Sequence, residues 1–331
     1  MNTLVVNERS KMKSNFDLDL LMELQYNLPL TETPLVDLAE RLGYSKERVL
    51  KEISRLIKDG VIKRYGANLN YKAFRDIKKA ALVGFNVDYE RVSEVASMIN
   101  RIDALKLKHN FLREHDKYNV WFTIKAENVE EIEKIVKEIA DECNISDYVL
   151  LPTKRVWKMD VKYDLFKGVS WSEKGIEPES VPTVDELGLD ANVVRKLESL
   201  EVVDRPFKFF ERYGFKESEI VDLTKELLKK NIARDFSGVL RESKIGFKEN
   251  GMTILKIDLE ARKIALKLIK KFPQITHLVE RVPHENWNYP IYFMVHAVNK
   301  DPIEKIREEV KSFEGVVEAM TIYSNKNLRE N

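Results

Sequence analysis

Histidine, arginine and tyrosine recur at matched spacing in two windows of this 331-residue chain. The first window, residues 108–126, reads KHNFLREHDKYNVWFTIKA, and the second, residues 276–297, reads THLVERVPHENWNYPIYFMVHA. Each runs His, three residues, Arg, a short gap, His, a short gap, Tyr and then an apolar stretch. All five histidines of the chain lie in these two windows, so the pattern is the most informative feature of the sequence.

These residue types suit a flat, apolar ligand that carries several carboxylates. The planar fork of arginine binds carboxylates through two hydrogen bonds, and histidine donates or accepts a proton near neutral pH or ligates iron. The matched residues are His109, Arg113, His115 and Tyr118 in the first window, and His277, Arg281, His284 and Tyr289 in the second. Trp121 and Trp287 can flank a macrocycle.

The strand-like spacing predicts which of these side chains share a face. Alternate residues of a strand project to the same side, so His109, Phe111 and Arg113 should project together. His277, Val279 and Arg281 should do the same. The second histidine of each window is then expected in the turn, with the tyrosine opening the next strand.

A less specific interpretation stays open for each residue taken alone. A lone His or Arg at a hairpin is usually a solvated surface group, and a Trp usually belongs to the core. The repeated spacing favours a site over that interpretation. His296 has no counterpart in the first window, where Lys125 aligns with it, and it is predicted on the other face from Tyr289.

Composition narrows the class of protein. The apolar fraction of 44% and the charged fraction of 34% are typical of a folded globular chain. We expect a cytoplasmic protein, since there is no apolar run of membrane-spanning length and no signal-peptide core at the start. The single Cys143 argues against an internal disulfide or a multi-cysteine zinc site. No Gly-rich phosphate loop, Ser/His/Asp set or HExxH motif is present.

Periodicity predicts an α+β chain built as a tandem repeat. Each repeat is a winged helix-turn-helix followed by a ferredoxin-like βαββαβ domain. Gly43-Tyr44 and Gly60-Val61 recur as Gly214-Phe215 and Asn231-Ile232, at an offset of 171 residues. The predicted ranges are a tail at 1–15, winged helix 1 at 16–75, ferredoxin-like domain 1 at 76–164, a linker at 165–187, winged helix 2 at 188–247 and ferredoxin-like domain 2 at 248–326. The wing, VIKRYGANLN, is expected to be two short strands around Gly66, and the two sheets are expected to form an internal pseudo-dimer. Further homo-oligomerisation is left open.

The helix-turn-helix raises DNA binding as an alternative. The stretch from Ser45 to Arg64 contains seven basic and three acidic residues, whereas the matching stretch from Lys216 to Asp235 contains five of each. A DNA-binding dimer reads two half-sites with two equivalent helices. Because only one copy is basic, operator binding through Ser45–Arg64 is the weaker interpretation.

The order of domains resembles the Lrp/AsnC family of regulators over nearly the whole chain, twice. Those regulators usually carry a Gly-rich effector loop at the hairpin that corresponds to residues 112–122. Here that hairpin is LREHDKYNVWF, and in the second copy ERVPHENWNYPIYF. These segments are similar to those of the siroheme decarboxylases, two-subunit enzymes built on the Lrp/AsnC architecture. The chain therefore resembles a fusion of both subunits.

The resemblance implies a carboxy-lyase that removes the acetate carboxyls at ring positions 12 and 18 of siroheme. The product would be 12,18-didecarboxysiroheme, a step of the alternative haem biosynthesis pathway, with no cofactor beyond the iron tetrapyrrole substrate. The expected partner is siroheme, with no membrane. The runner-up function is an Lrp/AsnC-type transcriptional regulator, including one that senses a tetrapyrrole.

We expect the paired residues to divide the work as follows. His115 and His284 protonate the carbon that loses carbon dioxide or the pyrrole system, and Tyr118 and Tyr289 assist as catalytic residues. His109, Arg113, His277, Arg281, Trp121 and Trp287 bind the substrate. No metal site is expected from the protein alone, but His109 or His277 is a candidate ligand of the siroheme iron. The gap between Arg and His is one residue in the first copy and two in the second, so the sites are expected to differ, with the second half the more catalytic.

Overall fold

The computed structural model describes residues 16–74, 78–104 and 106–329, so the predicted tail over residues 1–15 lies outside the described part. The chain divides into two compact units that do not follow the order of the predicted domains. The winged-helix unit holds the segments Met1–Phe74, Asp160–Ser172 and Ser180–Lys248. The barrel unit holds Arg75–Met159, Glu173–Glu179 and Glu249–Asn331. Both winged helices thus belong to one unit and both ferredoxin-like domains to the other, while the exact domain boundaries stay predictions.

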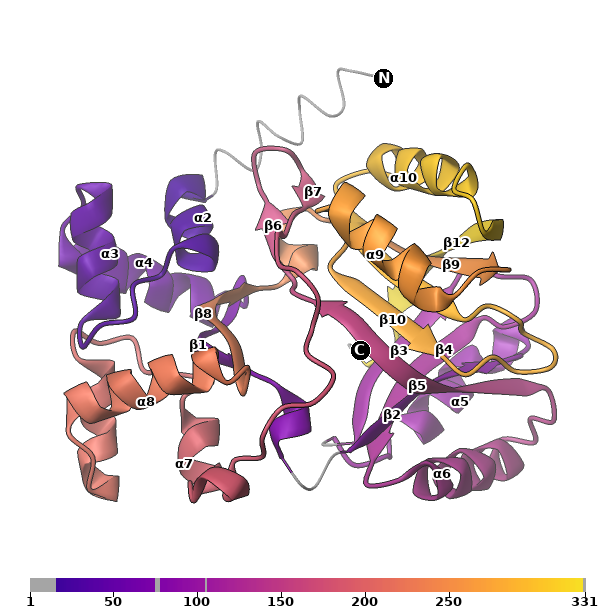
Figure 1. The fold of residues 1–331 in the computed structure, drawn as a ribbon, viewed down its shortest axis with the longest axis horizontal. Helices are drawn as coiled ribbons and strands as arrows, with labels where there is room; N and C mark the ends of the chain where they lie inside the picture. The colour runs from indigo at the N-terminus through magenta and orange to yellow at the C-terminus, as the bar shows by residue number, and fades with distance from the viewer. Residues whose placement is uncertain (1–15, 75–77, 105, 330–331) are drawn as a thin grey trace. The chain divides into compact units, whose positions relative to one another are not determined.

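The winged-helix unit contains the repeat that the glycine pattern predicts (Figure 1). The first copy comprises α2 (Leu18–Tyr26), α3 (Pro34–Leu42), α4 (Lys46–Lys58) and β1 (Ile62–Leu69). The second comprises α7 (Ala191–Lys196), the 3-10 helix η4 (Pro206–Tyr213), α8 (Glu217–Lys229) and β8 (Ala233–Leu240). Gly43 and Gly214 both end the middle helix in the left-handed conformation, with φ of 68° and 84°. Positive φ at these turns is what glycine permits at little cost, so the repeated glycines mark equivalent helix ends.

The prediction that the wing consists of two short strands is wrong. Residues 62–69 form one strand, β1, which pairs antiparallel with β8 of the other copy. Gly66, at φ 144°, also lets the chain approach the segment after α7, where the amide of Ala67 donates to the carbonyl of Leu197 at 2.8 Å. A Cβ at Gly66 would lie 2.2 Å from that carbonyl oxygen, so only glycine fits.

The predicted linker at 165–187 is not a structureless connection. It begins inside a short hairpin of β6 (Tyr163–Asp164) and β7 (Val169–Ser170), which belongs to the winged-helix unit. In the same unit the carbonyl of Trp171 accepts a hydrogen bond from the hydroxyl of Tyr26 at 2.7 Å. The Gly, Ser and Pro content therefore marks irregular backbone that is nonetheless bonded to the first winged helix.

In the barrel unit both βαββαβ orders are confirmed. The first half runs β2 (Lys79–Phe85), α5 (Val92–Ile99), β3 (Leu107–Arg113), β4 (Val120–Ala126), α6 (Val129–Glu142) and β5 (Tyr148–Met159). The second half runs β9 (Glu249–Ile257), α9 (Ala261–Lys271), β10 (His277–Arg281), β11 (Ile291–Ala297), α10 (Asp301–Lys311) and β12 (Val316–Asn327). Figure 1 shows the helices of both halves on the outside of the strands.

The two halves join into one closed antiparallel barrel, which confirms the predicted pseudo-dimer. Their strands follow the order β10-β5-β2-β4-β3-β12-β9-β11, and β11 pairs back with β10. The joints are equivalent, since the second strand of each half pairs with the last strand of the other: β3 with β12, and β10 with β5. Closure leaves no strand edge exposed along this ring.

Each strand layer therefore has two buried faces. The outer face of the first half packs under α5 and α6 through an aliphatic core that includes Val83, Val95, Phe122, Ile132 and Val136. The inner face meets the other half, and its core combines residues of both, namely Leu82, Tyr118, Trp121, Val149, Leu151, Met252, Ile254, Trp287, Tyr292 and Ile322. The residues predicted to carry chemistry lie along this inner core.

Candidate active site

Both arginines of the repeated motif occupy the last position of a strand, Arg113 in β3 and Arg281 in β10. The amide of Arg113 donates to the carbonyl of Asn119, and the amide of Arg281 to that of Pro290, each at 2.8 Å. Each guanidinium reaches the other half: Nη1 of Arg113 donates to the carbonyl of Ile322, and Nη1 of Arg281 to that of Leu151, each at 3.3 Å. The two arginines are thus held in equivalent places by the internal repeat.

The predicted faces are confirmed on both strands. On β3 the ring of His109 stacks on Phe111 with centroids 5.8 Å apart, and the guanidinium of Arg113 lies 5.3 Å from the same ring. On β10 the guanidinium of Arg281 lies 5.2 Å from the ring of Tyr292, an inner-face residue. Each arginine therefore points toward the inner core, and on β3 the exposed ring of His109 lies on the same side of the strand as Phe111 and Arg113.

An aromatic cluster lies where the two halves meet. Trp287 of the second half is its centre, with ring centroids 5.0 Å from His115, 5.4 Å from Tyr118, 5.5 Å from Trp121 and 5.1 Å from Tyr289. Both indoles are buried, with Trp121 1% and Trp287 5% exposed, and the Nε1–H of Trp287 donates to the hydroxyl of Tyr292 at 2.8 Å. Five of the predicted site residues therefore meet in one place.

Backbone hydrogen bonds set the tautomer of the two loop histidines. Nδ1 of His115 accepts from the amides of Lys117 and Tyr118 at 3.1 and 3.0 Å, and Nδ1 of His284 accepts from the amide of Asn286 at 3.2 Å. An Nδ1 that accepts carries no hydrogen, so the neutral ring carries its proton on Nε2. Burial lowers the pKa of His115, which further favours this neutral form. Both side chains can therefore donate an Nε2–H, but the same tautomer lacks the Nε2 lone pair that iron ligation needs.

Arg113 is a charged group that is buried in the barrel unit. It is 7% exposed, burial lowers its pKa to about 10, and its Nε has no hydrogen-bond partner among the described residues. Within the described part of the chain its guanidinium donates to a backbone carbonyl, and no carboxylate forms an ion pair with it. Burying a charge without a counter-ion costs several kcal/mol, about 3–5 when a partner is missing. Such a guanidinium is suited to an anion brought by a ligand.

The two tyrosines of the motif both donate to carboxylates. The hydroxyl of Tyr118 donates to Oδ1 of Asp147 at 2.9 Å, and that of Tyr289 donates to Oε1 of Glu318 at 2.8 Å. Burial, aided by these carboxylates, raises the pKa of Tyr118 and raises that of Tyr289 to about 12. Both stay neutral phenols at physiological pH. They precede rather than open the next strands, which begin at Val120 and Ile291.

The remaining predicted residues lie apart from the aromatic cluster. His277 is four residues before Arg281 on β10, or about 13 Å at the usual strand rise of about 3.3 Å per residue. Its ring lies 6.2 Å from that of His296, whose Nδ1 contacts Oδ1 of Asn250. The prediction that His296 and Tyr289 occupy opposite faces is wrong, because Tyr289 precedes β11 and packs against the inner core, to which the alternation from Tyr292 also directs His296.

Three members of the site escaped the sequence analysis: Tyr292, Asp147 and Glu318. Tyr292 had a usable signal, since it stands 171 residues after Trp121, at the offset of the whole repeat. The two carboxylates had the same signal, as each follows its tyrosine by 29 residues. Both carboxylates lie outside the two histidine windows, near the start of the last strand of each half.

Basic residues of the first winged helix are largely neutralised within their own unit. Lys46 pairs with Asp204 at 2.6 Å, Arg48 with Asp17 at 2.8 Å and Lys63 with Glu242 at 3.4 Å. Arg55 pairs with Glu52 and Asp59, and Arg64 with Glu198. Five of the seven basic groups between Ser45 and Arg64 thus have acidic partners, which reduces the field available to a phosphate backbone.

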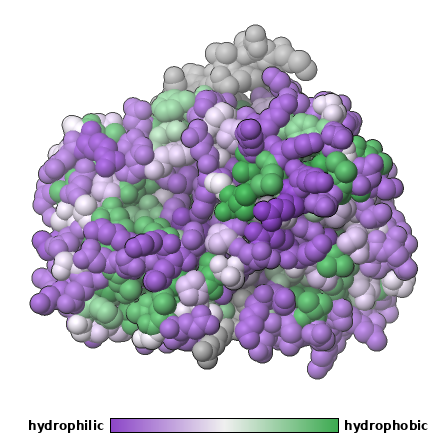
Figure 2. All heavy atoms as spheres, in the orientation of Figure 1, coloured by the Kyte–Doolittle hydropathy of each residue, from purple (hydrophilic) through white to green (hydrophobic). Residues whose placement is uncertain are grey.

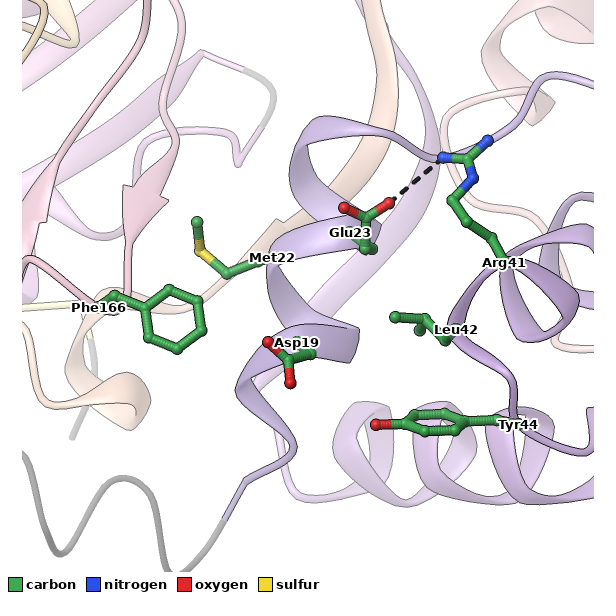
Figure 3. Close-up of a pocket in the computed structure, with 7 residues that line it drawn as sticks. All are labelled: Asp19, Met22, Glu23, Arg41, Leu42, Tyr44 and Phe166. Atoms are coloured by element: carbon green, nitrogen blue, oxygen red, sulfur yellow. Dashed lines mark hydrogen bonds and ion pairs between the residues drawn. The ribbon is translucent and has the colours of Figure 1, made fainter.

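A surface pocket of about 480 Å³ lies in the winged-helix unit (Figure 3). It is lined by Asp19, Met22, Glu23, Arg41, Leu42, Tyr44 and Phe166. Among the described lining residues Arg41 is the one cation, and it pairs with Glu23 at 3.3 Å, as the dashed line in Figure 3 shows. A lining with two carboxylates and one paired guanidinium is a poor match for a ligand rich in carboxylates, and no predicted site residue lies there.

The face of the molecule drawn in Figure 2 is mainly hydrophilic. Hydrophobic residues form small patches between the hydrophilic ones on that face. No helix in the described part of the chain combines the length and the apolar character needed to cross a membrane. Among those same residues, His, Cys, Asp and Glu nowhere gather in threes as a protein metal site requires.

Comparison with known families assigns both kinds of domain. A family model described as an AsnC-like ligand binding domain matches residues 77–158 and 244–329, together about half of the chain. A model described as a siroheme decarboxylase NirDL-like HTH domain matches residues 17–63.

One curated relative matches nearly the whole chain, and another matches less than half of it. It is 25% identical over 329 residues to a siroheme decarboxylase of Hydrogenobacter thermophilus, covering 96% of this chain and 94% of that protein. It is 32% identical over 146 residues to the siroheme decarboxylase NirD subunit of Pseudomonas aeruginosa, covering 44% of this chain and 93% of that subunit.

Among solved structures, the siroheme decarboxylase NirDL in complex with an iron-uroporphyrin III analogue shares the fold. The two superpose with a TM-score of 0.61 at 22% identity, over 97% of this chain and 92% of the other.

Proposed function

Because the chain belongs to the siroheme decarboxylases, enzymes with AsnC-like ligand-binding domains, we propose that it removes the acetate carboxyls at C12 and C18 of siroheme. The product is then 12,18-didecarboxysiroheme, and the step serves the alternative haem pathway. The names of the relatives support the substrate, and the resemblance of the two hairpin segments supports the positions.

The observation that carries the proposal is the aromatic cluster around Trp287 beside the inward-facing arginines. Indole and phenol rings offer apolar faces to a flat macrocycle, and such contacts contribute about 0.5–1.5 kcal/mol for each aromatic pair beyond simple burial. Arg113 and Arg281 offer guanidinium groups to carboxylates, and a hydrogen bond to a charged group is worth about 1.5–3 kcal/mol. A carboxylated tetrapyrrole satisfies both kinds of group at once.

The reaction is redox-neutral and needs only one proton for each carboxyl. The bond between the acetate methylene carbon and the carboxyl carbon breaks, carbon dioxide leaves, and the electron pair passes into the pyrrole system. A proton then reaches the methylene carbon and completes a methyl group. The protein's tasks are to hold the carboxylate, to exclude water and to deliver the proton.

We assign these tasks to the chain's own groups in each half. Arg113 and Arg281 hold carboxylates, and His115 and His284 donate the proton from Nε2 as imidazolium rings, which return to the neutral form. In that neutral form the hydrogen-bonded Nδ1 leaves the ring hydrogen on Nε2, the nitrogen that points away from the loop backbone. Trp121 and Trp287 form apolar walls, and Tyr118 and Tyr289 order the site beside the histidines.

Contact with the iron falls to His109 or His277 in this proposal. The loop histidines keep a hydrogen on Nε2, which leaves the two strand histidines as the better candidates for a lone pair directed at iron. No cofactor beyond the iron tetrapyrrole substrate is proposed, since its own ring accepts the electron pair.

The alternative of a DNA-binding regulator has little support from the winged-helix unit. Five of the seven basic groups between Ser45 and Arg64 have acidic partners. A regulator requires a salt-sensitive complex with duplex DNA, and a mobility-shift series at rising salt measures it directly.

The test is anaerobic incubation of the full chain with siroheme, followed by mass spectrometry and NMR of the extracted tetrapyrrole. We expect the loss of two carbon dioxide masses and two new methyl signals at C12 and C18. Binding with no loss of mass would overturn the proposal and leave a tetrapyrrole sensor as the better account.

A further inference from the structure

The same hydrogen bond occurs in both halves of the barrel, between a motif tyrosine and an acidic residue that the sequence pattern did not single out. Tyr118 donates to Asp147 at 2.9 Å, and Tyr289 donates to Glu318 at 2.8 Å. Each carboxylate follows its tyrosine by 29 residues. Both members of the second pair stand 171 residues after those of the first, which is also the offset between Gly43 and Gly214. The two pairs are therefore equivalent positions of the internal repeat.

Both pairs reach the centre of the candidate site. The ring of Tyr118 lies 5.4 Å from that of Trp287, and the ring of Tyr289 lies 5.1 Å from the same indole. Tyr118 also stacks nearly parallel to His115, with centroids 6.4 Å apart and planes 7° apart. Each carboxylate thus holds the hydroxyl of a tyrosine whose ring contacts Trp287.

The surroundings of the two carboxylates differ, although the hydrogen bond is the same. Asp147 also accepts from Nδ2 of Asn86 at 3.1 Å and pairs with Nζ of Lys117 at 3.4 Å. Glu318 is exposed on β12. An incidental surface contact would not be expected to keep donor, acceptor type and spacing in two such different settings.

We propose that Asp147 and Glu318 are positioning residues that hold Tyr118 and Tyr289 against Trp287 with the phenol hydrogen directed away from the ligand. The inference rests on the proposed function, because it assigns the tyrosines a place in siroheme turnover. A phenol whose hydrogen is donated to a carboxylate presents only oxygen lone pairs elsewhere. The tyrosines then accept hydrogen bonds in the site and do not supply the proton, so His115 and His284 remain the proton donors.

The raised pKa values of both tyrosines agree with this assignment, burial being the main cause and the carboxylates adding to it. A tyrosine that stays neutral and donates outward keeps its ring orientation at any physiological pH. The first pair is held from three sides through Asp147, whereas the second has an exposed acceptor. Because Tyr118 is fully buried while Tyr289 is partly exposed, loss of Glu318 should free its tyrosine more completely than loss of Asp147.

The test compares Asp147→Ala with Asp147→Asn and Glu318→Ala with Glu318→Gln in the full chain. We expect each alanine variant to lower kcat for siroheme about ten- to a hundredfold, as small misplacements in active sites do, with little change in KM. The amide variants keep an acceptor oxygen and should recover most of the rate. The exposed carboxylates Asp141 and Glu314, changed to Asn and Gln, are matched controls with unchanged rates. Alanine variants with wild-type kcat, or amide variants as slow as alanine ones, would overturn the proposal.

A second measurement does not depend on turnover. Tyrosine labelled with ¹³C at Cζ reports the hydrogen bond of its own hydroxyl, and Tyr118→Phe and Tyr289→Phe assign the two signals. Asp147→Ala should shift the Tyr118 signal alone, and Glu318→Ala that of Tyr289 alone. Unchanged signals would contradict the pairing. If wild-type protein leaves siroheme intact while these shifts occur, the proposed function fails and the pairing stands.

Discussion

The two halves of the barrel share one framework but differ in the loop that follows the arginine. In both, the arginine ends a strand and donates to a carbonyl of the last strand of the other half. The loop has one residue between Arg113 and His115, and two between Arg281 and His284. In the first half the histidine packs edge-on against Trp287 at 5.0 Å, with its ring planes at 79°. In the second half His284 instead forms a backbone bridge with Trp287.

This difference makes the halves interdependent. The longer second loop supplies Trp287, which contacts His115, Tyr118 and Trp121 of the first half as well as its own Tyr289. Neither half alone can assemble the aromatic cluster. The two halves therefore place their arginines at equivalent strand positions. Their loops differ, and together they form one shared aromatic cluster.

Removing the loop histidines gives the largest expected effect. His284→Ala should abolish turnover, since a positioned proton donor contributes about 10²- to 10⁴-fold, with only a modest change in stability because the side chain is half-exposed. We expect a smaller loss in His115→Ala. Rates are measured anaerobically by mass spectrometry, and circular dichroism verifies the fold. Wild-type turnover in His284→Ala would refute the assignment, and a larger loss in His115→Ala would reverse the ranking of the halves.

Replacement of the arginines should separate binding from catalysis. Arg113→Met should weaken siroheme binding by about 1.5–3 kcal/mol, roughly ten- to a hundredfold, because its guanidinium is buried with no acidic partner in the described chain. Stability should change little, since the variant also removes a buried charge. Arg281→Met should weaken binding less, because Arg281 also donates to Oγ1 of Thr153 at 3.0 Å. An absorbance titration measures both, and equal affinity in all three proteins would contradict this account.

Trp287→Phe tests the link between the halves. The smaller ring loses the hydrogen bond to Tyr292 and part of the packing, so we expect a loss of about 1–3 kcal/mol in unfolding free energy together with weaker siroheme binding. Trp157→Phe is the matched control, because Trp157 is also buried and donates Nε1–H, to Glu280 at 3.3 Å, outside the cluster. Urea unfolding should detect both variants, whereas binding should change only in Trp287→Phe. Weaker binding in both would make the effect one of stability.

The smallest expected effect is a pH dependence of stability that comes from His115. Burial lowers its pKa below the ordinary value of 6.5, so the folded state favours the neutral ring. Its contribution to stability is complete above pH 6.5 and is lost as the pH falls from there to the folded pKa. His115→Gln should flatten the stability profile over that interval in thermal unfolding at closely spaced pH values. An unchanged slope would show that other groups set the acid response.

Local patterns predicted most of the framework. The alternation along 108–113 and 276–281 placed His109 and Arg113 on one face, and the repeated glycines located the helix ends. Pairing between distant strands was beyond such patterns: Gly66 lies opposite Ser237, and no local signal announces that partner. The same holds for the cluster, since Trp287 reaches His115 only after the halves close into a barrel. The tyrosine–carboxylate pairs were visible in principle, through a constant spacing of 29 residues.

The most direct test of the shared site is a single-turnover experiment with the full chain in excess over siroheme. One tetrapyrrole should bind between the two halves and lose both carboxyl groups, with a singly decarboxylated species rising and then falling in the mass spectra. A reaction that stops after one carboxyl, or a siroheme that binds and keeps its mass, would contradict the account.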